Sequence, residues 1–239
     1  MHDLIVIGAG PAGSTSSYIA SLLGLKTLII DFQEFPRFKP CGGGLTVKSL
    51  KLLESLDIDI DSIVEKYCKR VYLITYSGVY ELVSSEPIIT TVSREVFDKH
   101  LLQHALDQGV EFMLDKIVSI ECRSDEVIVR GLRDIYRAKV LIGADGAFSI
   151  TAKFLGNHVC MRDCAIAYMS YVEDSHIDYA VLDFTRIKYG YAWIFPKRNS
   201  LNIGVGSLRI ENYTKVLIDY VSELNLKLRF VRGYPLPIK

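Results

Sequence analysis

The sequence predicts an α/β fold in which a three-layer domain is interleaved with a mostly antiparallel β-sheet domain. An apolar run at 3–7, a helical stretch at 11–23 and a second apolar run at 26–31 follow one another in the order of a βαβ unit. A long region at 157–208 has instead the pattern of successive strands, rich in Tyr. Short strands expected at about 110–143 separate the two, so the chain returns to its first domain before it leaves again.

The remaining elements follow from local pattern. After a loop rich in Pro and Gly at 36–44, apolar residues recur at helical spacing, and two apolar stretches flank the turn Ser77-Gly78 as in a hairpin. Ser93 is expected to cap a helix that ends at Gly109. The apolar residues with helical spacing are Leu45, Val47, Leu50, Leu53 and Leu56. Further strands are expected at 110–113, 117–122, 126–130, 135–143 and near 228–234, with a helix at about 212–223.

These elements predict two discontinuous domains. The first comprises residues 1–67 and 93–156, and the second, strand-rich one comprises residues 68–92 and 157–239. At 239 residues the chain is long enough for such an arrangement to bury a core in each part.

The composition is that of an ordinary globular protein. Hydrophobic residues make up 49%, charged residues 23%, and 28 basic residues balance 28 acidic ones, which argues against a nucleic-acid partner. No apolar run approaches the roughly 20 residues of a transmembrane helix. The N-terminus lacks the features of a secretory signal, so a cytoplasmic protein is expected, with peripheral contact to a membrane left open.

The cysteines and histidines predict no metal site. The five cysteines are odd in number and scattered, which favours reduced thiols over a disulfide framework. Cys160 and Cys164 have a metal-like spacing, but no second Cys/His pair follows in register.

The strongest motif is the glycine turn Gly8-Ala9-Gly10-Pro11-Ala12-Gly13 between the first strand and the first helix. In a turn of this type the first glycine allows the tight bend, the second admits a pyrophosphate and the third lets helix and strand approach. Asp31 ends the second strand, where a carboxylate can accept hydrogen bonds from an adenosine ribose. The motif therefore predicts a Rossmann-type dinucleotide site, and the acid disfavours the 2′-phosphate of NADP. A glycine turn without ligand is the alternative.

Three stretches in the same order resemble a flavoprotein superfamily that includes aromatic hydroxylases, flavin-dependent halogenases and geranylgeranyl reductases. They are the glycine turn, the segment Ser93-Arg94-Glu95-Val96-Phe97-Asp98, and the segment Val140-Leu141-Ile142-Gly143-Ala144-Asp145-Gly146-Ala147-Phe148-Ser149. The resemblance implies FAD as the cofactor, with Arg94, Asp145 and Gly146 among its contacts. A solvated Arg94 and an Asp145 that only caps the following helix remain the alternatives. Ala152 stands where the superfamily often has an arginine.

Two further segments resemble geranylgeranyl reductases in particular. Lys39-Pro40-Cys41-Gly42-Gly43-Gly44-Leu45 is similar to their cysteine-glycine loop, and Gly190-Tyr191-Ala192-Trp193-Ile194-Phe195-Pro196 with Asn202-Ile203-Gly204-Val205-Gly206 is similar to their Tyr-x-Trp-x-Phe-Pro and Gly-x-Gly signature. The resemblance implies reduction of isolated double bonds in isoprenoid lipids. Arg37, Cys41, Gly42 and Gly43, in and next to the cysteine-glycine loop, are expected among the cofactor contacts. The electron donor (NADPH, NADH or ferredoxin) is left open.

The residue types suit that chemistry. Tyr191, Trp193 and Phe195 alternate along one strand, so they can share a face and line an apolar pocket, together with Gly204 and Gly206; ordinary core packing is the alternative. The glycines Gly42 and Gly43 let their loop approach a flat ring, and Arg37 and Lys39 are cations available to the Cys41 thiol. Cys41 is expected to act beside the flavin, or else to be a small buried filler.

The superfamily pattern continues beyond the strand around Pro235 with a further flavin motif, and the chain stops at Lys239. A C-terminal part of the family fold is therefore expected to be absent. A flavin-dependent monooxygenase or halogenase and an inactive FAD-binding remnant remain the alternative functions.

Overall fold

The computed structural model describes residues 1–157, 159–173, 177–209 and 212–238. The chain forms two compact units. Unit 1 consists of Met1–Phe38 and Glu95–Cys160, and unit 2 consists of Lys39–Arg94 and Met161–Lys239.

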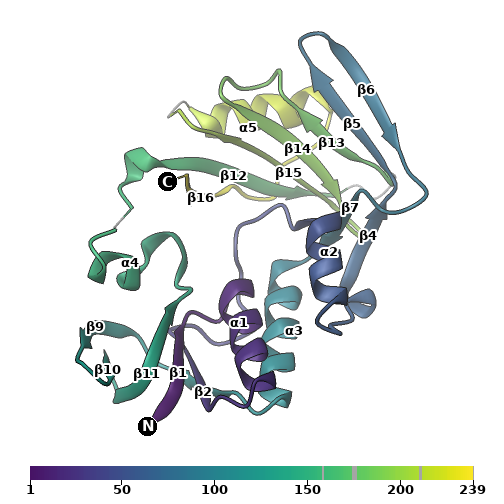
Figure 1. The fold of residues 1–239 in the computed structure, drawn as a ribbon. Coiled ribbons are helices and arrows are strands. Elements are labelled where there is room, and N and C mark those ends of the chain that lie inside the picture. Colours follow the sequence, from purple (N-terminus) through teal and green to yellow (C-terminus); the bar gives the residue numbers. More distant parts are fainter. Residues whose placement is uncertain (158, 174–176, 210–211, 239) are drawn as a thin grey trace. The chain divides into compact units, whose positions relative to one another are not determined.

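Unit 1 contains a six-stranded sheet in the order β8-β2-β1-β11-β10-β9 (Figure 1). Its strands are β1 His2–Ile7, β2 Thr27–Asp31, β8 Glu111–Leu114, β9 Ile117–Cys122, β10 Val127–Gly131 and β11 Ile135–Gly143. The pairs β8·β2, β2·β1 and β1·β11 are parallel, whereas β11, β10 and β9 pair antiparallel as a meander. The βαβ unit predicted from the sequence is therefore present, and the α/β class is confirmed.

Three layers result because successive strand residues face opposite sides. On one side Leu4 and Val6 pack with Ala105 of the helix α3 Arg94–Asp107 and with Ala20 of α1 Pro11–Leu22. On the other side the alternate residues of β1 and β2 pack against the meander, where Val129 is fully buried, and against the short helix α4 Ile150–Phe154. In Figure 1 α1 and α3 run alongside β1 and β2.

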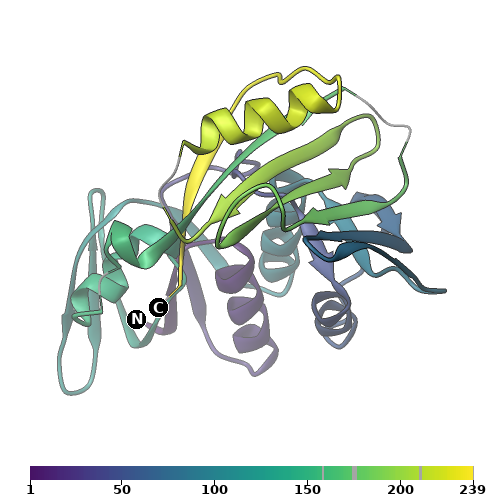
Figure 2. The same ribbon diagram turned by 90° about the horizontal axis from the view of Figure 1, so that it is seen from above.

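Unit 2 contains a seven-stranded sheet in the order β16-β12-β15-β14-β13-β5-β6. Its strands are β5 Arg70–Thr75, β6 Gly78–Val83, β12 Cys164–Val172, β13 Ala180–Asp183, β14 Gly190–Pro196, β15 Leu201–Ser207 and β16 Arg232–Pro237. All pairs are antiparallel except β13·β5, so the mostly antiparallel sheet was predicted correctly. The helix α5 Tyr213–Glu223 covers one face, where Leu217 packs with Ile203 and Val205 (Figure 2).

A small sheet of β3 Gly44–Thr46, β7 Ile89–Val92 and β4 Val64–Cys68, which the sequence did not predict, completes unit 2. The following helix α2 runs over Val47–Glu54, and Thr46 caps it by accepting a hydrogen bond from the Ser49 N–H. The expectation that Leu45 belongs to this helix is wrong, because Leu45 pairs with Thr90 in the sheet. Short 3₁₀ turns lie at Asp61–Ile63, Gly146–Phe148 and Met161–Asp163.

The compact units differ from the predicted domains in one long segment, and by a few residues at the boundaries near Arg94 and Cys160. Residues 39–67 were grouped with the first domain from the sequence, and in the structure they lie in unit 2, because β3 and β4 pair with β7. The division into a cofactor-binding part and a substrate-binding part stays a prediction. Within the described residues, no helix is both long and apolar enough to cross a membrane.

Candidate functional site

The glycine turn of unit 1 joins the end of β1 to the start of α1. The Gly8 N–H donates to the Ile30 carbonyl at 2.8 Å, which fixes the turn on β2. A Cβ on Gly13 would overlap the carbonyl oxygen of Gly8, so only glycine permits this approach of helix to strand. Pro11 is the first residue of the helix, and Ala12, the second, is exposed.

Gly10 differs from the other glycines of the turn because the space beside it is open. A Cβ at this position would meet only Nη2 of Arg37, at 3.5 Å. Gly10 is also the N-cap of α1, and no side chain caps the helix there. The first N–H groups of a helix have no partner within the helix, and its dipole favours an anion at this end. The turn thus has both the space and the donors that a pyrophosphate requires.

Asp31, at the end of β2, is buried next to the turn. Its Oδ2 accepts a hydrogen bond from the Ala9 N–H at 2.7 Å, and its Oδ1 accepts one from the Gln33 N–H at 3.0 Å. The carboxylate therefore holds the turn in place from the protein side, a role that the sequence did not reveal. Its contact with an adenosine ribose stays a prediction.

Arg37 lies beside the same turn. Its guanidinium stacks on the Phe35 ring, 4.6 Å from the centroid, and its Nη1 lies 3.1 Å from Oδ2 of Asp98, which is fully buried. This Nη1 makes no hydrogen bond, since the ion pair lacks hydrogen-bond geometry. Arg37 was predicted as a cofactor residue, whereas Asp98 was missed, although it belongs to the segment that follows Ser93. Nη2 of the same guanidinium lies near the open space beside Gly10.

Asp145 is engaged within unit 1. Its carboxylate accepts hydrogen bonds from the Ile150 N–H at 2.8 Å, the Thr151 N–H at 3.2 Å and the Ser149 hydroxyl at 2.5 Å. The side chain therefore caps α4, as in the alternative considered for it. Gly146, with φ +76°, begins the 3₁₀ turn that lies between Asp145 and α4. Arg94, the first residue of α3, belongs to unit 2.

In unit 2 the cysteine-glycine loop packs on the aromatic strand β14. A Cβ on Gly42 would lie 2.9 Å from Cδ2 of Phe195 and 3.0 Å from Nε1 of Trp193. The Gly43 N–H donates to the Cys41 sulfur at 3.3 Å. The glycines thus approach aromatic rings of the protein itself, and Cys41 is partly buried at the edge of this contact.

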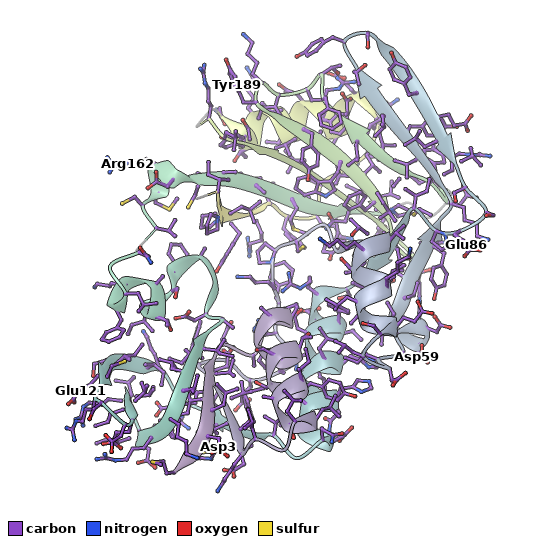
Figure 3. The ribbon with its side chains drawn as sticks, in the orientation of Figure 1. Asp3, Asp59, Glu86, Glu121, Arg162 and Tyr189 are labelled. Carbon is purple, nitrogen blue, oxygen red and sulfur yellow. The ribbon has the colours of Figure 1, made fainter. Side chains whose placement is uncertain are left out.

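Tyr191, Trp193 and Phe195 share one face of β14, as alternation predicts. Their neighbouring ring centroids lie 6.0 and 6.4 Å apart, and Phe184 extends the row, 5.7 Å from Tyr191. Trp193 is only 6% exposed, whereas Tyr191 is 40% exposed. Burial, and to a smaller extent the neighbouring Cys41, raises the pKa of the Tyr191 phenol. The exposed end of the row therefore consists of Tyr191 and Phe184. Tyr189, labelled in Figure 3, precedes Tyr191 in the loop.

The Gly-x-Gly segment lies on the adjacent strand β15. A side chain at Gly204 would overlap the Trp193 ring, so this glycine creates the space that the indole fills. Gly206 pairs with Tyr191 across the two strands. Trp193 is thus enclosed between β15 and the cysteine-glycine loop.

Lys197, which the sequence analysis overlooked, lies under this loop. It is 4% exposed, and its Nζ donates a 2.8 Å hydrogen bond to the Val92 carbonyl. Burial lowers the pKa of its amino group to about 8. The sequence feature that could have indicated this buried lysine is its position directly after the apolar strand that ends at Pro196. Lys39, by contrast, stacks on Tyr234, 3.2 Å from the ring centroid.

Comparison with known proteins places these features in context. A model of the FAD binding domain family matches residues 1–205. The chain is 30% identical to a digeranylgeranylglycerophospholipid reductase of Methanococcus vannielii, over 100% of this chain and 64% of that protein. A geranylgeranyl bacteriochlorophyll reductase-like structure from Thermoplasma acidophilum matches with a TM-score of 0.88 and 25% identity, over 100% of this chain and 66% of that one.

A halogenase structure in complex with phloroglucinol and FAD matches with a TM-score of 0.79 at 17% identity, over 99% of this chain and 60% of that one, which shows a shared fold. The chain spans about three-fifths of the length of the curated relatives it matches. The resemblance to geranylgeranyl reductases that the sequence indicated is therefore confirmed.

Proposed function

The chain belongs to the FAD-binding domain family, and from this premise we propose that it is part of an FAD-dependent reductase of isolated double bonds in isoprenoid lipids. The open Gly10, the uncapped start of α1 and the Arg37 guanidinium, whose Nη2 lies beside Gly10, fit the pyrophosphate of FAD. Asp31, Gly42, Gly43, Arg94, Asp145 and Gly146 are the further residues proposed to contact the cofactor. The Asp145 carboxylate also accepts a hydrogen bond from the Ile150 N–H at the start of α4.

The observation that carries the proposed substrate is the aromatic row with the cysteine-glycine loop packed on it. An isoprenoid chain presents only apolar surface, and the exposed ring of Tyr191 and its neighbour Phe184 offer matching contacts. One relative is named a digeranylgeranylglycerophospholipid reductase, and the similar solved structure is named geranylgeranyl bacteriochlorophyll reductase-like. Trp193 and Phe195 continue the same face where the cysteine-glycine loop packs on it, and they are proposed to line the pocket with Tyr191.

The chemistry requires a hydride and a proton at the two carbons of the double bond. Bound reduced FAD supplies the hydride. Cys41 and Tyr191 carry transferable protons at this face, and burial raises the pKa of the Tyr191 phenol above its ordinary value. The proposal places the protein in the cytoplasm, in peripheral contact with the membrane that carries its substrate.

The test is a single turnover on anaerobically prereduced, FAD-loaded protein mixed with a geranylgeranyl lipid. Mass spectrometry of the lipid is expected to show added hydrogen, and the Methanococcus vannielii reductase provides the positive control. The proposal would be contradicted if the control reductase saturates its lipid and this protein leaves the lipid unchanged. The absorption spectrum is recorded first, so that a failure to bind flavin is separated from a failure to reduce.

The second candidate, a flavin-dependent monooxygenase or halogenase, is favoured by the shared fold with the halogenase. It requires oxygen consumption coupled to modification of an aromatic substrate, which an oxygen electrode measures. An inactive FAD-binding remnant would show flavin absorption without turnover in either assay.

A further inference from the structure

Asn202 lies where the aromatic row of β14 meets the cysteine-glycine loop. Along β15 the alternate residues Asn202, Gly204 and Gly206 share one face. Asn202 pairs with Phe195 across the two strands, so this is the face that carries the aromatic row. Since the other two residues are glycines, Asn202 carries the side chain that β15 directs to this face. It is fully buried, so its polar atoms need partners within the protein.

The Asn202 amide joins two groups with opposite hydrogen-bonding requirements. Its Oδ1 accepts from the indole N–H of Trp193 at 2.8 Å, and its Nδ2 donates to the carbonyl of Cys41 at 3.3 Å. An indole N–H can only donate and a backbone carbonyl can only accept, so these partners fix the orientation of the amide. A carboxylate at this position could only accept, and an aliphatic side chain could do neither. The amide therefore suits this position by its chemistry as well as by its size.

The cysteine-glycine loop is held at both of its ends. At one end Gly44 pairs with β7, and the Val92 N–H donates to the Gly43 carbonyl at 2.8 Å. At the other end the Cys41 carbonyl accepts from Asn202, while the Cys41 sulfur accepts from the Gly43 N–H at 3.3 Å. Backbone and thiol of Cys41 are therefore both held, and Asn202 holds the backbone.

We propose that Asn202 is a positioning residue, whose amide holds the loop against Trp193 and thereby fixes the place of Cys41 at the aromatic row. That this place matters for alkene reduction rests on the proposed function; the hold of Asn202 on the loop does not. Small errors of alignment are costly in catalysis, since a displacement of about 1 Å can slow a reaction about a hundredfold. Loss of the amide is therefore expected to lower the rate of reduction more than the affinity for the lipid.

The test compares Asn202→Leu, which keeps the approximate size of the side chain and removes both hydrogen bonds, with Ile203→Val. Ile203 is the next residue of β15 and is also fully buried, but it packs with Leu217 of α5 on the opposite face. Ile203→Val thus disturbs the same strand without touching the loop.

Two probes report the state of the loop in the purified protein. Acrylamide quenching of fluorescence reports the exposure of Trp193, which is the only tryptophan of the chain. Alkylation by iodoacetamide, measured by peptide mass spectrometry, reports the exposure of Cys41 relative to the exposed Cys122. In Asn202→Leu the alkylation rate of Cys41 is expected to rise about fivefold, which corresponds to the loss of one hydrogen bond of average strength. Quenching should rise with it, and Ile203→Val should keep both wild-type values.

A single turnover on prereduced, FAD-loaded protein gives the readout that separates positioning from packing. In Asn202→Leu the rate constant at saturating lipid is expected to fall at least about tenfold. The lipid concentration at half-maximal rate should stay near the wild-type value, because the exposed rings of Tyr191 and Phe184 remain in place.

Unchanged quenching and alkylation in folded Asn202→Leu would overturn the proposal, as would an equal rise in Ile203→Val. A wild-type rate of reduction with a loosened loop would overturn it too. If Asn202→Leu does not fold, Trp193→Phe removes the indole donor and keeps a ring, and an unchanged alkylation rate of Cys41 in that variant would count against the proposal. A wild-type protein that leaves the lipid unsaturated while both probes respond in Asn202→Leu would contradict the reductase function and leave the hold on the loop standing.

Discussion

The indole N–H of Trp193 donates a 2.8 Å hydrogen bond to Oδ1 of the fully buried Asn202. The Nδ2 of the same amide donates at 3.3 Å to the carbonyl of Cys41. One side chain on β15 therefore connects the aromatic strand to the cysteine-glycine loop. A substitution of Trp193 is expected to alter the conformation of the loop, whereas a substitution of the exposed Tyr191 is not.

Trp193→Ala is expected to lower the free energy of unfolding by about 3–5 kcal/mol, because it leaves a cavity and removes the partner of Asn202. Tyr191→Ala, at the exposed end of the row, should cost far less stability and change the chain-length preference for the lipid. Urea denaturation measures the first effect and lipid saturation assays measure the second. Equal losses of stability would argue that Tyr191 is a core residue.

Gly10→Val is expected to abolish FAD binding while the protein stays folded, because a Cβ at this position meets only Nη2 of Arg37 and the side chain fills the space for the pyrophosphate. Gly13→Ala is the contrasting variant: its Cβ would overlap the Gly8 carbonyl, so its melting temperature should fall. Flavin absorbance and thermal unfolding separate the two. Normal flavin content in folded Gly10→Val would remove the assignment of this turn.

Asp31→Ala is expected to weaken FAD binding by about 1–3 kcal/mol, the range for polar groups left without a partner. The structure adds a second consequence, because the Ala9 and Gln33 N–H groups also lose their acceptor. Calorimetry with FAD measures the affinity, and thermal unfolding of the FAD-free protein measures the effect on the turn. Unchanged affinity would place the adenosine elsewhere.

Cys41→Ser is expected to slow alkene reduction in single turnover and to leave reduction of the flavin by an external donor almost unchanged. Serine is nearly isosteric with cysteine, but its hydroxyl is a far weaker acid than a thiol. Cys122→Ser, at an exposed cysteine, is the control. A wild-type rate in Cys41→Ser would confine the residue to packing.

Lys197→Met is expected to change how stability depends on pH. With a pKa of about 8 in the folded protein and 10.5 as the ordinary value, the unfolded chain binds more protons between these limits, so this lysine makes the free energy of unfolding rise with pH there. The full penalty of the buried charge, about 3 kcal/mol, is present below pH 8 and is gone above pH 10.5.

The checking measurement is the unfolding free energy of wild type minus that of Lys197→Met at several pH values. This difference should rise across the window from pH 8 to 10.5. A difference independent of pH would show that Lys197 titrates normally in the folded protein.

Local pattern was enough for the elements of unit 1. The βαβ unit, the glycine turn and the acid at the end of β2 follow from periodicity and from the steric needs of a tight turn, all of which act over a few residues. The alternation of Tyr191, Trp193 and Phe195 likewise places them on one face of a strand, whatever the strand packs against.

Tertiary structure decided which of these residues are buried and which cations lie near the cysteine-glycine loop. Leu45 lies in a strand and not in the predicted helix, because it pairs with Thr90 of β7. Pairing between residues this far apart leaves no signal in the local sequence. The sequence offered Arg37 and Lys39 for the Cys41 thiol because they are close in the chain. Arg37 instead pairs with Asp98 and Lys39 stacks on Tyr234, while Lys197, more than 150 residues further on, lies under the loop. Charges act through distance in space, which sequence separation does not determine.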